Sequence, residues 1–187
     1  MLVANLLIVV FLIFLNGFFA MSELAVVSSR RARLQQMAQN GKRGAEGAIK
    51  LIDDPTSFLS TVQVGITLVG IFAGAYGGSV FAGPLAEFLA PLPVIGPYAE
   101  GFAFGLVVVL ITYFSLILGE LVPKRFALAN PEAIACFVSS PMRALAKIGA
   151  PIVWFLRVST ETMVRLLGGS KVAESTVTEE EGKALIA

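Results

Sequence analysis

Three long segments of this chain contain no charged residue: residues 1–22, 55–85 and 101–119. A helix needs roughly 20 mainly apolar residues to cross the ~30 Å hydrocarbon core of a bilayer, and each segment is about that long or longer. We therefore expect an all-α membrane protein with three transmembrane helices, at about residues 2–27, 58–83 and 102–122.

The composition excludes several classes of function. Only 14% of the 187 residues are charged and the net charge is +1, so no basic surface is available for nucleic acid. The single cysteine and the absence of histidine exclude an intrachain disulfide and the usual zinc and haem ligands. No pairing of a nucleophile with a base is visible, so an enzyme is not expected. A bound metal would be held by oxygen atoms, which favours Mg²⁺, Ca²⁺ or Na⁺.

The basic residues predict how the chain is oriented. Cytoplasmic loops of membrane proteins carry an excess of Lys and Arg. Six basic residues follow the first span, Lys124 and Arg125 follow the third, and the linker at residues 83–100 has none. We expect a multi-pass protein of the cell membrane, with its N-terminus outside and its C-terminus cytoplasmic.

Residues 131–168 are less uniformly apolar. Asn130-Pro131-Glu132 is typical of a helix start, with an Asn cap, a proline in the first turn and an acid near the positive helix end. Prolines and basic residues interrupt the run that follows, which favours two or three amphipathic juxtamembrane helices on the cytoplasmic surface. A fourth span is the alternative. Residues 1–168 would form the transmembrane domain, and residues 169–187 a linker towards a cytosolic domain.

Glu120 lies three residues before Pro123 at the end of the third span. A proline clashes with the carbonyl group four residues earlier, which belongs to Gly119, so the helix must kink or bulge there. A carboxylate and a released carbonyl oxygen would then lie side by side, as in discontinuous helices that bind cations. The alternative is an ion pair between Glu120 and Lys124 or Arg125.

The other two spans also carry polar residues. Asn16 and Glu23 are seven residues apart on one face of the first helix, with Ser22 beside them. An amide in hydrocarbon needs a partner on another helix, whereas a membrane serine usually bonds to its own i−4 carbonyl group. On the second helix, a polar stripe predicts an interior lining: Ser60, Gln63 and Thr67, with Thr61 and Gly65 beside them. Gly70, Gly74 and Gly78 favour close helix packing.

Three motifs resemble the CNNM/CorC family of magnesium transporters across essentially the whole chain. They are Asn16-Gly-Phe-Phe-Ala-Met-Ser-Glu23, Thr61-Val-Gln-Val-Gly-Ile-Thr67-Leu, and Gly119-Glu-Leu-Val-Pro-Lys124 with Asn130-Pro-Glu132. The resemblance implies a homodimer in the lipid bilayer that exports Mg²⁺, driven by inward Na⁺. It also implies that nucleotide-sensing CBS-pair domains follow the membrane domain.

The resemblance assigns roles to individual residues. Ser22, Gly119 and Glu120 would bind the cation together with the second-helix stripe of Ser60, Gln63 and Thr67. Pro123 and Lys124 would shape the bulge, and Glu23 would be a second ion ligand or an ion-pair partner. A Mg²⁺-binding membrane scaffold or sensor that signals through a cytosolic domain is the alternative function, and a channel is a third.

Overall fold

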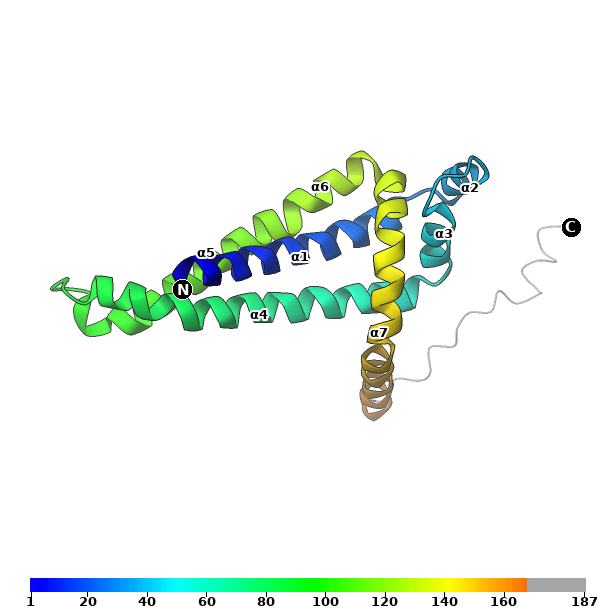
Figure 1. Ribbon diagram of the computed structural model, residues 1–187. Helices are drawn as coiled ribbons and strands as arrows, with labels where there is room; N and C mark the ends of the chain where they lie inside the picture. Colours follow the sequence, from blue (N-terminus) through cyan, green and yellow to red (C-terminus); the bar gives the residue numbers. More distant parts are fainter. Residues whose placement is uncertain (168–187) are drawn as a thin grey trace, which may run out of the picture. The chain divides into compact units, whose positions relative to one another are not determined.

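The computed structural model describes residues 1–167, and in these residues every regular element is a helix. This confirms the all-α prediction. The predicted linker at residues 169–187 lies outside the described residues. The helices, shown in Figure 1, are α1 (Leu2–Ser28), α2 (Arg31–Gln39), α3 (Ala45–Asp53), α4 (Pro55–Leu89), η1 (Gly96–Tyr98), α5 (Ala99–Leu116), η2 (Ile117–Leu121), α6 (Val122–Ala129) and α7 (Pro131–Leu166).

Three helical segments are long and apolar enough to cross a membrane: Leu2–Ser28, Pro55–Leu89 and Gly96–Ala129, with mean hydropathies of 2.6, 1.8 and 2.4. They contain the three predicted spans and extend beyond two of them. The second begins at Pro55 because Asp54 caps it, its carboxylate accepting a hydrogen bond of 3.2 Å from the Ser57 main-chain N–H. An aspartate cap followed by a proline at the first helical position is a common helix start.

The three spans run side by side (Figure 1), with α1 in contact with α4, η2 and α6, and α4 in contact with α5. The buried face of α1 includes several small residues, among them Gly17, Ala20 and Ala25. Large apolar side chains such as Phe11, Phe72 and Phe102 are exposed instead. Because lipid tails are as apolar as these side chains, close packing of small residues is what holds such helices together.

The glycines of α4 do not all serve the close packing that their spacing predicts. A Cβ atom on Gly78 would lie 2.9 Å from the Phe104 ring, so this glycine does allow α5 to approach. A Cβ atom on Gly70 or Gly74 would have no neighbour within 4 Å. These two glycines leave open space beside the helix instead.

A small helical cluster follows the first span. Leu34 of α2, Ala48 of α3 and Val138 of α7 are fully buried in one apolar core. Glu132, only 5% exposed, accepts a hydrogen bond of 3.4 Å from the Arg30 main-chain N–H and forms an ion pair of 3.5 Å with Arg33. The predicted helix start at Pro131 is therefore confirmed and is also anchored to the start of α2.

Residues 131–166 form one helix, not the two or three that their prolines suggest. Pro141 and Pro151 each remove a main-chain hydrogen bond, but a single missing bond can be tolerated within a helix. The chain divides into two compact units, the first ending at Ala150 and the second beginning at Pro151. Among residues 1–167, α7 is not one of the segments apolar enough to cross a membrane.

Gly44 provides a test of the helical cluster. It has a φ of +84°, and an added Cβ atom would overlap the carbonyl oxygen of Cys136. Gly41 has a similar φ of +72° but no atom within 4 Å of an added Cβ. We expect Gly41→Ala to cost about 1–2 kcal/mol of left-handed strain, and Gly44→Ala to cost about 1–3 kcal/mol more because of overpacking.

Unfolding of the two variants in detergent, followed by circular dichroism, measures this difference. Equal melting temperatures would show that α3 and α7 do not pack as described.

Candidate cation site

The third span is interrupted where the sequence predicts it. Residues Ile117–Leu121 form a π-helical segment between α5 and α6, with Pro123 in the first turn of α6. The wider π turn makes room for the proline ring, which would otherwise clash with the Gly119 carbonyl group. The predicted bulge is therefore confirmed.

The released Gly119 carbonyl oxygen is bound by the first helix. It accepts a buried hydrogen bond of 3.0 Å from Nδ2 of Asn16. The backbones of α1 and η2 are close together at Gly119. A Cβ atom added to Gly119 would lie 3.1 Å from the Ile13 carbonyl oxygen. Asn16 thus has the cross-helix partner that an amide in hydrocarbon requires, and it joins α1 to η2.

The carbonyl oxygen of the Asn16 side chain has no such partner. Asn16 is 5% exposed, and within the described residues its Oδ1 is a buried side-chain atom without a hydrogen bond. Buried polar atoms are nearly always paired, and an unpaired one costs about 1–3 kcal/mol. Leaving this acceptor unpaired therefore carries a cost in stability.

Two acids from different helices meet one ammonium group. Nζ of Lys124 lies 2.8 Å from Oε1 of Glu120 and 3.8 Å from Oε2 of Glu23. The three side chains are partly exposed, at 30%, 36% and 28%. The structure therefore shows the ion pair between Glu120 and Lys124 that the sequence analysis gave as the alternative to a cation ligand. Glu23 forms a second ion pair with the same lysine.

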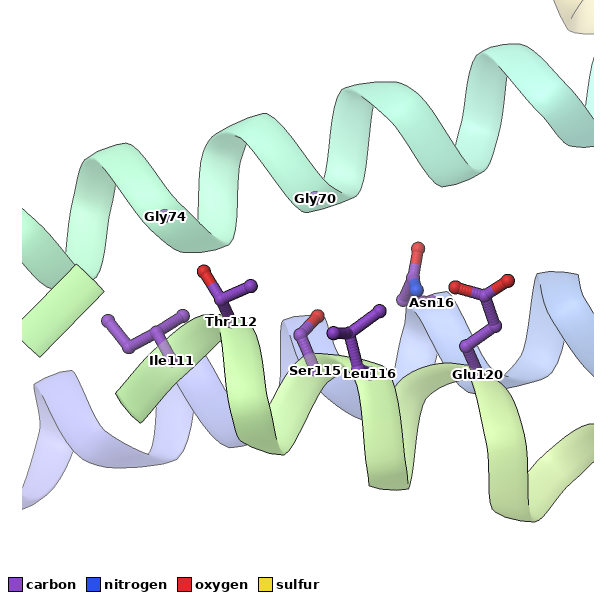
Figure 2. Close-up of a pocket in the computed structure, with 8 residues that line it drawn as sticks. All are labelled: Asn16, Gly70, Gly74, Ile111, Thr112, Ser115, Leu116 and Glu120. Carbon is purple, nitrogen blue, oxygen red and sulfur yellow. The ribbon is translucent and has the colours of Figure 1, made fainter. Parts of the chain in front are cut away.

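Glu120 and Asn16 also line a cavity of about 190 Å³ between the spans. Figure 2 shows their oxygen atoms, and those of Thr112 and Ser115, spread along the side that faces Gly70 and Gly74 of α4. The remaining lining residues are Gly70, Gly74, Ile111 and Leu116. The open space beside Gly70 and Gly74 is therefore part of this cavity.

Thr112 and Ser115 are not among the residues that sequence reasoning selects. Ser115 and Glu120 are five residues apart, which would separate them by more than a third of a turn in a regular α-helix. The π segment, with its i→i+5 repeat, brings both onto the cavity. The bulge itself was the one signal in the sequence that could have indicated this alignment.

Other predicted site residues lie outside the cavity. Ser22 is fully buried and donates a hydrogen bond of 2.6 Å to the Phe18 carbonyl oxygen, the usual arrangement for a membrane serine. Thr61 likewise donates to the Ser57 carbonyl oxygen at 2.8 Å. A Cβ atom on Gly65 would overlap the Phe19 ring at 2.7 Å, so Gly65 serves helix packing.

The rest of the second-helix stripe does not line this cavity. Gln63 and Thr67 are exposed and Ser60 is half-buried, and none of the three lines the cavity. Their spacing places them on one face of α4, as predicted, and Gly70 and Gly74, which do line the cavity, lie further along the same face. Their role as ion ligands stays a prediction.

Three apolar spans, a π-helical interruption and two acids at a shared ammonium group define an integral membrane domain with a polar site between its helices. The sequence matches the family described as "Cyclin M transmembrane N-terminal domain" (CNNM) over residues 7–187. The chain belongs to this family, as the three sequence motifs suggested.

Several curated proteins are similar to this chain. It is 50% identical over 175 residues to the UPF0053 protein sll0260 of Synechocystis, covering 94% of this chain and 39% of that protein. It is 32% identical over 184 residues to the UPF0053 protein YrkA of Bacillus subtilis, covering 97% and 42%. It is 27% identical over 182 residues to the Polyamine export protein of Escherichia coli K12, covering 97% and 40%. The chain thus spans about two fifths of the length of these relatives.

Lys124 tests the arrangement of the two acids. Lys124→Met leaves Glu23 and Glu120 facing each other without their shared cation. We expect the melting temperature in EDTA to fall by about 2–4 °C, the shift that accompanies roughly 1 kcal/mol in a protein of this size, and millimolar Mg²⁺ to restore it.

The matched control is Arg125→Met, which removes the neighbouring base; within the described residues, no ion pair of Arg125 is found. A fall of the same size for both variants, with no recovery in Mg²⁺, would contradict the pairing of the acids.

Proposed function

We propose that this chain is the membrane domain of a cation transporter and that Mg²⁺ is its substrate. The observation that carries the proposal is the convergence of Glu23 from α1 and Glu120 from η2 on one ammonium nitrogen. Acids in membrane spans are costly and mark ion pathways by default. Lys124 occupies the position that a transported cation would take.

The chemistry of the pair suits Mg²⁺. This ion usually retains several water molecules and is bound by one or two carboxylates, not enclosed by many. Within residues 1–167 no three side chains of the His, Cys, Asp and Glu types gather into a metal cluster. A partly hydrated Mg²⁺ bridging Glu23 and Glu120 needs no third acid, provided that Lys124 moves aside.

An alkylammonium substrate is a second candidate, and two observations favour it. A relative of this chain is named Polyamine export protein. In addition, Glu120 already holds a primary ammonium group, at 2.8 Å, beside a cavity that Gly70 and Gly74 leave open. A substrate amine could replace the Lys124 ammonium directly, with its alkyl chain along Ile111 and Leu116.

The proposal has further parts. The protein acts in the cell membrane as a homodimer, with its N-terminus outside and its C-terminus cytoplasmic, and an inward flow of Na⁺ drives Mg²⁺ out. A Mg²⁺-binding scaffold or sensor, in which the ion is structural, is the competing function. Transport is favoured because the acids lie in the spans and not on a surface loop.

Flux measurements test the proposal. In proteoliposomes loaded with a Mg²⁺-sensitive dye, we expect Glu120→Gln and Glu23→Gln to lower the Mg²⁺ flux at least about tenfold, the effect of losing 1.4 kcal/mol of binding. Each variant removes a charge but keeps the shape of the side chain. Glu87→Gln, on an exposed acid of α4 that is not part of the pair, is the matched control.

Normal Mg²⁺ flux in Glu120→Gln would rule out the pair as the transport site. Mg²⁺ binding without flux, in the chain joined to the rest of its protein, would favour the sensor. Spermidine efflux that depends on Glu120, without Mg²⁺ flux, would favour the polyamine candidate.

A further inference from the structure

A cluster of basic residues lies between the first two spans. Helices α2 and α3 fill the segment from Ser28, where α1 ends, to Pro55, where α4 begins. Because both ends of this segment join spans, it stays beside the membrane that they cross. A group of about four to eight Lys and Arg residues next to a span is typical of a site for anionic lipid. The segment carries six, all exposed: Arg30, Arg31, Arg33, Lys42, Arg43 and Lys50.

Few acids balance these charges. Residues 30–54 and 131–150 together contain eight basic and four acidic residues. Two of the acids form ion pairs with Arg31 and Arg33, and a third caps α4. The fourth, Glu46, forms no ion pair among the described residues. In the same part of the chain no ion pair is found for the six other bases: Arg30, Lys42, Arg43, Lys50, Arg143 and Lys147.

Close packing of α3 against α7 brings bases of the two elements together. A Cβ atom on Gly44 would overlap the main chain of α7, so the loop that carries Lys42 and Arg43 lies beside this helix. A Cβ atom on Gly47 would lie 3.2 Å from the guanidinium group of Arg143. Gly44 caps α3 and Gly47 is in its first turn. The three bases therefore gather at the start of α3.

The first part of α7 lies at the level where lipid headgroups are expected. A Cβ atom on Gly149 would lie 3.8 Å from Cγ2 of Thr61, which is in the second turn of the α4 span. On its exposed side this part of α7 carries an apolar stripe at helical spacing: Phe137 (71% exposed), Pro141, Ala144 and Ile148 (74% exposed). Arg143 and Lys147 flank the stripe, roughly a quarter to a third of a turn away. Helices of this kind lie in the interface between lipid and water, and anionic lipids strengthen their binding.

We propose that this basic cluster binds anionic phospholipids, with their phosphate groups at Lys42, Arg43 and Arg143 and their acyl chains against the apolar stripe. Arginine suits a phosphate group because its planar fork donates two parallel hydrogen bonds. In the proposed orientation the cluster meets the cytoplasmic leaflet, which carries the negative surface potential. The inference rests on that orientation and not on the ion that the protein transports.

Thermal unfolding of the purified chain in detergent tests the lipid site. The micelles contain increasing fractions of phosphatidylglycerol or, in parallel, of phosphatidylcholine with the same acyl chains. We expect a saturable rise in melting temperature with phosphatidylglycerol only. Each base near an anionic surface strengthens binding by a factor of about five. The half-saturating fraction of phosphatidylglycerol should therefore increase at least about tenfold in the double variant Lys42→Gln and Arg43→Gln.

The matched control is the double variant Arg125→Gln and Arg165→Gln. It removes two exposed bases that lie outside the cluster and have no ion pair among the described residues. It should bind phosphatidylglycerol nearly as the unmodified chain does. The exchange of Lys42→Arg and Arg43→Lys keeps both charges and should also keep the binding. A loss in the glutamine variant is then due to charge and not to a disturbed loop.

Four results would overturn the proposal. An equal rise with phosphatidylcholine would show that the stripe binds lipid regardless of charge. An equal loss in the control variant would show that the attraction is spread over the whole chain. Millimolar inorganic phosphate that stabilises as much as phosphatidylglycerol would make a soluble anion the ligand. Stabilisation that follows protein concentration, with a larger mass by light scattering, would assign the stripe to a second copy of the chain. None of these results depends on Mg²⁺ flux, so this inference and the transported ion are tested separately.

Discussion

The site depends on a hydrogen bond that proline makes available. Pro123 has no N–H group and would clash with the Gly119 carbonyl group in a regular α-helix, so the third span widens into a π segment. The Gly119 carbonyl oxygen therefore lacks the hydrogen bond that residue 123 would donate in an α-helix. In a membrane that oxygen must find another donor. Asn16 supplies it from α1, and the glycine at position 119 permits the close approach. One interaction thereby holds two helices together and leaves the Asn16 side-chain oxygen without a partner among the described residues.

The same segment determines where the charges lie. Glu120 is part of the π turn and Lys124 follows one turn later, so the two form an i, i+4 ion pair at 2.8 Å. Glu23, seven residues after Asn16, is placed on the same face of α1 and reaches the same ammonium group. Ser22 and Thr61, by contrast, donate hydrogen bonds within their own helices. Glu23 and Glu120 instead share Lys124 across two spans, which is why we propose a transported ion there.

Much of this arrangement could be predicted from the sequence because it depends on local chemistry. Charge-free runs identify spans, Asp54-Pro55 and Asn130-Pro131 mark helix starts, and Pro123 marks the bulge. The sequence could not predict that Thr112 and Ser115 line the cavity with Glu120, because their alignment depends on how many residues form the π segment. The spacing of Gly70 and Gly74 is likewise ambiguous, because small residues permit either close packing or a cavity.

The central claim is that a divalent cation takes the place of the Lys124 ammonium group between Glu23 and Glu120. The most direct measurement is a crystal structure of the chain in saturating Mn²⁺, located by its anomalous scattering as a substitute for Mg²⁺. We predict an anomalous peak within ligand distance of both carboxylates, with the Lys124 side chain turned away. A peak elsewhere, with Lys124 still between the two acids, would contradict the claim.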